Sequence, residues 1–247
     1  MVAFVGAPHR IDDRGSQALK SLKQIGFDQY YQAEQMGHVL YFEGSTDLSV
    51  LLAFARKLGH AAMAVLARPF THFVGNQPSA ARDHFFGLSE AKRDLVGFAL
   101  FDRMTLPPSD SSGRLREFSW SRREIENYLS QRETLLAWAV DDSHRTGLGL
   151  LSEASWRRAM AEAIDEIEAA MTTLGKSPWS PDVKVTDEFL NPLFALFYKK
   201  LGLPNLMNKS DYHQLARFVP ADEISDEVVT VLDGIVTVAR RARPVGD

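Results

Sequence analysis

Two short apolar runs that each end at an acidic residue most constrain the fold of this chain. The first run covers residues 39–42 and is followed by Glu43, and the second covers residues 95–101 and is followed by Asp102. The intervening segments alternate in type, with helical spacing of apolar residues at 48–58 and 80–91 and a further short apolar run at 70–74. This alternation predicts an α/β fold with a βαβ core and a sheet that is parallel at least in part, flanked by helices.

The remaining sequence predicts a lead-in segment and a helical portion around that core. We expect a lead-in over residues 1–37, a core over residues 38–150, and a mostly helical C-terminal portion over residues 151–247 that packs on the core or completes it. Residues 103–119 lose periodicity and collect proline, serine and glycine, so they predict a long loop.

One stretch resembles a nucleotide-binding motif but lacks the required context. AMTTLGKS at residues 170–177 matches a relaxed phosphate-loop pattern. A phosphate loop must follow a strand and open a helix, whereas this stretch follows a predicted helix and precedes two prolines. We therefore interpret it as a helix C-terminus capped by Gly175, and we expect no ATP hydrolysis by this chain alone.

The composition excludes several kinds of site. The 247 residues include no cysteine, which rules out disulfides, thiolate zinc sites and thiol nucleophiles. No apolar run approaches the roughly 20 residues that span a bilayer, and the N-terminal sequence lacks a signal-peptide pattern, so we expect a cytoplasmic protein with no membrane partner. A net charge of −4 gives no overall basic field for nucleic acid. Clustered carboxylates that bind metal ions would still be compatible with a polyanionic substrate.

Glu43 and Asp47 lie at the predicted carboxyl end of the first strand. In an open α/β sheet this edge is where ligands bind, and Gly44 allows a tight turn with room for a metal ion or a phosphate. Asp102 follows the second strand. An ordinary strand-to-helix turn, with Asp47 as an acid near the helix N-terminus, is the alternative explanation of the first pair.

A further pair of acids follows the predicted loop. Glu124 and Glu126 share a face if their segment is a strand, but they point about 200° apart if it is a helix. Carboxylates are the ligands that hard divalent cations prefer, and two ions about 3.5–4 Å apart can flank both reacting oxygens of a phosphodiester. The candidate metal ligands are therefore Glu43, Asp47, Asp102, Glu124 and Glu126.

The order and strand-end placement of these acids resemble the Toprim domain, the Rossmann-like fold of topoisomerases, bacterial primases and the OLD (overcoming lysogenization defect) nucleases. VLYFEGSTDLSVL is similar to the OLD-type segment of a strand, EG, an aspartate and a helix, and WSRREIENYL is similar to the later acidic motif of that group. The resemblance implies a first acidic pair, a second-motif aspartate and a third-motif glutamate, which fall on Glu43 with Asp47, on Asp102, and on Glu126 with Glu124 as its neighbour.

The resemblance also implies a catalytic lysine downstream, for which Lys209 in NLMNKSDYHQL is the candidate. An exposed lysine before a helix is the alternative. One position departs from the family pattern, because Toprim enzymes commonly carry Asp-x-Asp at the second site and this chain has Met104 in place of the second aspartate. Methionine does not bind Mg²⁺, so another acid or water would have to complete that site.

On this resemblance, we expect a Mg²⁺- or Mn²⁺-dependent endonuclease domain that cleaves or nicks DNA with a metal-activated water, in the setting of phage defence. Arginines near the acids are candidates for phosphate contacts or for ordinary solvated surface, namely Arg103, Arg122 and Arg123. RNA is an alternative substrate, since no base-reading motif is present.

A non-catalytic Toprim module that assembles with a partner ATPase is the alternative from a different functional class. The first residues of the chain resemble the join between an ABC-type ATPase and a Toprim domain, so an ABC-type ATPase domain or subunit is the expected partner. A homodimer is a further open alternative.

Overall fold

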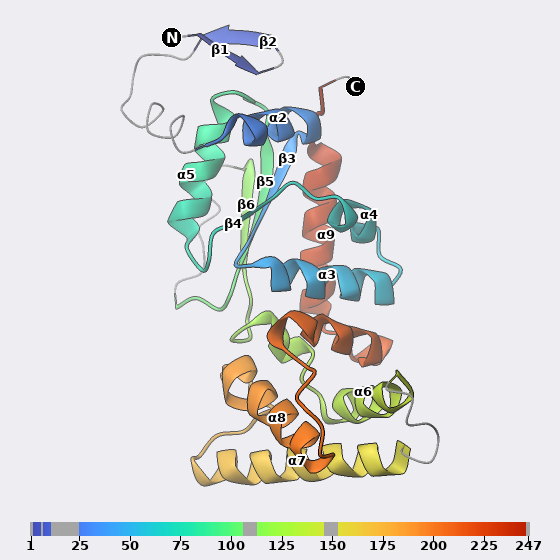
Figure 1. The fold of residues 1–247 in the computed structure, drawn as a ribbon. Helices are drawn as coiled ribbons and strands as arrows, with labels where there is room; N and C mark the ends of the chain where they lie inside the picture. The colour runs from blue at the N-terminus through green and yellow to red at the C-terminus, as the bar shows by residue number, and fades with distance from the viewer. Residues whose placement is uncertain (1, 6, 11–24, 106–112, 146–152, 246–247) are drawn as a thin grey trace. The chain divides into compact units, whose positions relative to one another are not determined.

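The computed structural model describes residues 2–5, 7–10, 25–105, 113–145 and 153–245 (Figure 1). These residues fall into two compact units. Unit 1 comprises Met1–Leu48, His60–Ser119 and Val229–Asp247, and unit 2 comprises Ser49–Gly59 and Trp120–Val228. Each unit is thus assembled from separate segments of the chain. The predicted boundaries after residues 37 and 150 remain predictions.

Unit 1 contains a four-stranded sheet in which every described pairing is parallel. The strand order is β4-β3-β5-β6, and a separate antiparallel hairpin pairs β1 with β2. The strands are β1 (Val2–Val5), β2 (Ala7–Arg10), β3 (His38–Phe42), β4 (Thr71–Phe73), β5 (Val96–Phe101) and β6 (Leu115–Ser119). The predicted α/β fold with parallel strands is confirmed.

The helices of unit 1 follow the strands in the expected alternation. They are α2 (Phe27–Met36), α4 (Ala62–Ala67), α5 (Pro78–Ser89), the start of α3 (Ser45–Lys57) and most of α9 (Asp226–Arg241). The predicted loop over residues 103–119 is wrong at its end, where β6 extends the sheet.

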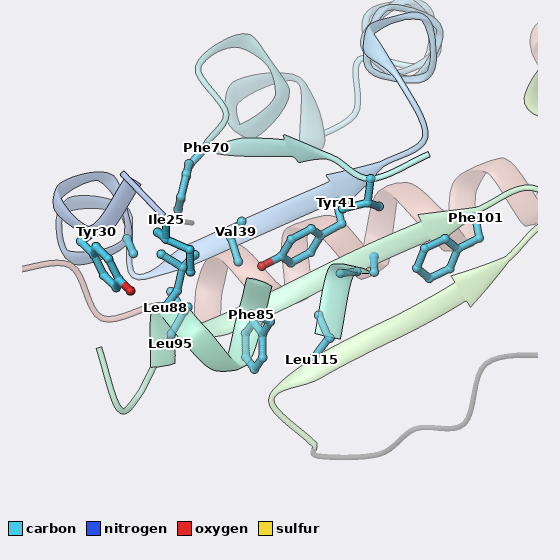
Figure 2. Close-up of a cluster of buried hydrophobic side chains, with 14 residues drawn as sticks. Ile25, Tyr30, Val39, Tyr41, Phe70, Phe85, Leu88, Leu95, Phe101 and Leu115 are labelled. Carbon is cyan, nitrogen blue, oxygen red and sulfur yellow. The ribbon is translucent and has the colours of Figure 1, made fainter. Parts of the chain in front are cut away.

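The two faces of the sheet are covered by different helices. Tyr41 of β3 and Ala99 of β5 belong to a buried cluster with side chains of α2 and α5, shown in Figure 2. Successive strand residues point to opposite faces, and Phe98 accordingly packs against α9 on the other side. The approach there is close, because a Cβ atom added at Gly234 would lie 2.6 Å from the Phe98 ring.

Unit 2 is helical apart from its loops. Its elements are η1 (Ile125–Tyr128), α6 (Arg132–Arg145), α7 (Glu153–Thr173), the π-helical turn η3 (Thr186–Leu190), α8 (Asn191–Lys200), η4 (Lys209–Phe218) and η5 (Ala221–Glu223), together with most of α3. Aromatic rings fill its core, where Trp138 and Trp156 each contact Phe197 edge-on. The Tyr198 hydroxyl donates a 2.9 Å hydrogen bond to buried Asp142. The predicted helical C-terminal portion is confirmed.

Residues 170–177, which match the relaxed phosphate-loop pattern, form the helix C-terminus that the sequence predicts. It ends α7, and Gly175 adopts the left-handed conformation with φ of 71°. The backbone N–H of Lys176 donates to the carbonyl of Met171 at 2.9 Å, which is the closing bond of a Schellman cap. A helix, α7, leads directly into this stretch where a phosphate loop requires a strand, so it is not a phosphate loop. Among the helices of the described residues, none has the length and apolar content that crossing a membrane requires.

Candidate functional site

Glu43 and Asp102 leave neighbouring parallel strands at the same edge of the sheet. Tyr41 of β3 is paired with Ala99 of β5, so Glu43 lies opposite residue 101 and Asp102 follows one residue later. Both carboxylates are partly exposed where the strands end. Because carboxyl ends of parallel strands form the ligand-binding edge of such sheets, these two side chains are the centre of the candidate site.

Ser119 braces the turn that carries Asp102. Its hydroxyl donates to the carbonyl of Asp102 at 3.0 Å and accepts from the backbone N–H of Met104 at 3.1 Å. Ser119 is the last residue of β6, which pairs with β5 in parallel. Sequence reasoning missed this residue because it assigned the segment to a loop. No local pattern identifies a serine that bonds across to the next strand end.

Asp47 is bound to the turn that follows β3. Its carboxylate accepts a 2.7 Å hydrogen bond from the backbone N–H of Gly44, and the residue is 8% exposed. α3 begins at Ser45, so Asp47 sits in the first helical turn and bonds back to the residue that precedes the helix. This geometry is the capped turn that the sequence left open as the alternative. The hydrogen bond from Gly44 holds the Asp47 carboxylate at the turn that carries Glu43.

Glu126 and Lys209 lie together in unit 2. The Lys209 ammonium is 3.7 Å from a Glu126 carboxylate oxygen, and the Glu126 side chain is only 3% exposed while that of Lys209 is 45% exposed. Burial and the nearby carboxylates, with Glu126 the strongest among them, raise the pKa of Tyr212 above its ordinary value. The resemblance selects these two residues from distant segments of the sequence, and the structure pairs the buried carboxylate with the half-exposed ammonium.

Glu124 has a structural role at the same turn. It is 2% exposed, and its carboxylate accepts a 2.5 Å hydrogen bond from the backbone N–H of Thr186. It also forms a reciprocal capping box with Asn127 at the start of η1. The segment is neither the strand nor the α-helix that the sequence left open. Glu124 is extended, and a short 3₁₀ helix begins at Ile125, between this residue and Glu126. The former carboxylate is thus occupied by backbone donors.

The sequence did not predict a further charged side chain, Lys184, near Glu124 and Lys209. Lys184 bonds to Asp187 at 2.7 Å, which is the main reason that the pKa of Lys184 is raised. Glu124 raises it further, while Lys209 lowers it. Lys184 therefore belongs to the electrostatic environment of Glu124 and Lys209. Its surroundings in sequence, a loop after two prolines, carry no signal of that proximity.

The candidate nucleic-acid contacts differ in their surroundings. Arg122 donates to the carbonyl of Asn127 at 2.9 Å and lies over the Tyr128 ring at 4.8 Å, so it helps to hold η1. Arg123 is exposed, and its backbone N–H bonds to the carbonyl of Pro181. Arg103 is partly exposed beside Asp102. The Arg122 guanidinium thus already has a protein partner.

Met104 occupies the position of the second aspartate and packs inward. It contacts the buried cluster between the sheet and the helices α2 and α5. The side chain is therefore part of the apolar core, and it supplies no oxygen to the edge of the sheet. Asp110 in the predicted loop, an acid that could complete the second site if the loop folds back, lies outside the described residues.

The arrangement at the sheet edge suits a water-rich cation site. Within the described part of the chain, no three histidine or acidic side chains gather closely enough to hold a metal ion alone. Mg²⁺ keeps several waters and is commonly bound through one or two carboxylates. The oxygen donors Glu43 and Asp102 fit that chemistry, whereas an all-protein cage does not form here.

The predicted site residues thus fall into two sets. The sheet-edge set in unit 1 consists of Glu43, Asp47 and Asp102, and the helical set in unit 2 consists of Glu124, Glu126 and Lys209. Comparisons of the chain with protein-family models, with curated proteins and with solved structures found no match.

Proposed function

We propose that this chain is a divalent-metal-dependent endonuclease domain of the OLD-type Toprim class, which cleaves or nicks DNA. The observation that supports the proposal most strongly is the position of Glu43 and Asp102 after adjacent parallel strands. Acids in this position can share one hydrated cation at the edge where α/β proteins bind ligands. The family resemblance supplies the reaction class, and phage defence remains a prediction from it.

Each residue has a distinct part in the proposed reaction. Glu43 and Asp102 would hold Mg²⁺ or Mn²⁺, and Ser119 would keep the Asp102 turn in place. When bound, the cation supplies Lewis-acid activation of water and offsets phosphate charge. For Lys209 in unit 2, the family resemblance implies stabilisation of the negative charge that develops during phosphodiester cleavage. The buried carboxylate of Glu126 would fix the position of that ammonium.

The test is cleavage of supercoiled plasmid DNA by the purified chain in Mn²⁺ or Mg²⁺. We expect the wild type to nick the plasmid, and Glu43→Gln and Asp102→Asn to lower the rate by at least about 100-fold, since each removes a charged ligand. Asp83→Asn is the matched control, because Asp83 is an exposed acid of α5 in the same unit. A wild type that is inactive with both metals, or a Glu43→Gln variant that nicks at the wild-type rate, would refute the assignment.

Lys209→Met separates the roles of the lysine. We expect slower cleavage with unchanged DNA affinity if the ammonium acts on the reaction, and weaker affinity at an unchanged rate if it is only a surface contact. A structured RNA offered in parallel decides between the two nucleic acids. Preferential cleavage of that RNA would move the substrate to RNA while keeping the metal-dependent chemistry.

A non-catalytic module is the second candidate, and Met104 is the observation that favours it. The core packing of Met104 removes a ligand that the family pattern supplies, and backbone N–H groups occupy the carboxylate of Glu124. Such a module would assemble with an ABC-type ATPase. Restoring the pattern with Met104→Asp tests this directly, since metal-dependent nicking that appears only in the variant would identify the natural chain as non-catalytic.

A further inference from the structure

Unit 2 contains a basic cavity whose lining includes none of the residues assigned to the proposed reaction. Its volume is about 390 Å³, within the range of small-ligand sites. One wall is the last two turns of α3 and the other is the second half of η4. The lining residues are Ala53, Arg56, Lys57, His213, Gln214 and Arg217. Three of them carry a permanent positive charge, and none carries a negative one.

The helix dipole explains only part of this charge. Arg56 and Lys57 lie in the last turn of α3, where cations offset the negative end of the dipole. Arg217 comes from a different element and faces the same cavity. Its guanidinium pairs with Asp141, which cancels one of the three charges. Arg56 and Lys57 therefore leave an excess of positive charge on the lining.

Hydrogen bonds hold the polar groups of this lining in place. The Lys57 ammonium donates to the carbonyl of Arg217 at 2.7 Å, which ties the two walls together and leaves two N–H donors on the ammonium. His213 bonds through Nδ1 to the carbonyl of Ser210 at 2.8 Å, so its Nε2 is the remaining polar atom of the ring. In the described residues, the Arg56 guanidinium forms no ion pair or hydrogen bond, although the backbone carbonyl of Arg56 accepts from Gly59.

We infer that this cavity binds a phosphate group. Guanidinium and ammonium groups are the usual protein partners of phosphate, and an arginine without a protein partner has its full fork of donors available. The lining offers no aromatic ring except the imidazole of His213, so it provides little surface on which a base could stack. The cavity thus recognises phosphate and not base identity. The phosphate belongs either to a polynucleotide backbone or to a small phosphate compound.

Binding measured without divalent metal tests the inference separately from the nuclease proposal. Fluorescence anisotropy in EDTA would follow a labelled single strand of about 20 nucleotides, and an unlabelled polynucleotide, inorganic phosphate and ATP would be added separately as competitors. We expect Arg56→Gln to weaken binding about tenfold, a loss of about 1.4 kcal/mol for a charged contact. The slope of log affinity against log salt should decrease by about 0.7 for the lost phosphate contact.

The control is Arg158→Gln, because Arg158 is an exposed arginine of α7 outside the cavity lining. Weaker binding by Arg56→Gln but not by Arg158→Gln supports phosphate binding in the cavity. Arg56→Lys should recover part of the affinity. Competition only by other polynucleotides assigns the phosphate to a backbone, and competition by millimolar phosphate or ATP assigns it to a small compound. Equal affinities of Arg56→Gln and wild type for all three probes, or equal losses in Arg56→Gln and Arg158→Gln, would overturn the inference.

Discussion

His84 of α5 is held inside unit 1 by partners that suit the neutral imidazole. Its Nδ1 accepts a hydrogen bond from the Tyr41 hydroxyl at 2.9 Å, and its Nε2–H donates to the Gln29 side chain at 2.9 Å. The ring stacks on His72 with centroids 3.7 Å apart. Protonation would place a second charge-bearing N–H in this buried setting. Burial, with a smaller contribution from His72, lowers the pKa of His84 from 6.5 to about 3.

This shift predicts a loss of stability on acidification. Between pH 6.5 and about 3 the unfolded chain binds a proton at His84 that the folded chain does not bind, so the free energy of unfolding falls as pH falls. Above pH 6.5 both states are neutral at this residue and the effect vanishes. From pH 7.5 to pH 5.5 the expected loss is about 1.4 kcal/mol from His84 alone. The lowered pKa values of His38 and His72 act in the same direction.

The difference between wild type and His84→Gln isolates this contribution, because glutamine can occupy the site without titrating. All four tryptophans lie in unit 2, so tryptophan fluorescence does not report on this part of the molecule. Urea unfolding should instead be followed by hydrogen exchange of peptides that cover β3. We expect the wild type to lose about 1.4 kcal/mol more than His84→Gln between pH 7.5 and 5.5. Equal losses in the two proteins would refute the reasoning.

Three further predictions concern the packing that supports the sheet. Gly234→Ala should destabilise unit 1 by about 1–3 kcal/mol although alanine favours helices, because the added methyl would meet the Phe98 ring; hydrogen exchange in β5 measures it. Gly97→Ala should lower the free energy of unfolding by a similar amount, since its Cβ would lie 2.8 Å from Leu115. Gly44→Ala is the control, because its Cβ would have no neighbour nearer than 4.0 Å, and it should cost less than about 1 kcal/mol in urea unfolding. Glu117→Ala should cost about 3 kcal/mol by the same assay, because the Glu117 side chain is fully buried and bonds Arg82 through both oxygens at 2.6 and 2.7 Å.

The sequence predicts the elements whose residues form continuous local patterns. Strands β3 and β5 are recognisable because they are buried on both faces and therefore apolar, apart from His38 at the start of β3. Strand β6 is not recognisable, because its sequence LREFS carries two charges. Glu117 is buried there only because Arg82 neutralises it from α5. A pairing across that separation leaves no trace in the local pattern.

The candidate site divides in the same way. The sheet-edge acids are predictable, since the ends of parallel strands must meet at one edge. The family resemblance selects Glu126 and Lys209 as separate candidates, but neither it nor any periodicity predicts that the two lie 3.7 Å apart. The capping roles of Glu124 and Asp47 were partly hidden, because a carboxylate that bonds backbone N–H groups has the same sequence as one that binds a metal.

The segmented composition of unit 1 has a consequence for the order of folding. Residues 229–247 complete this unit, and α9 covers Phe98 there. During synthesis these residues follow the whole of residues 120–228, so unit 2 has all of its segments before unit 1 does. Until α9 arrives, the face of the parallel sheet that carries Phe98 lacks the cover of this helix. A nascent chain at that stage exposes the kind of surface that chaperones bind and that favours aggregation.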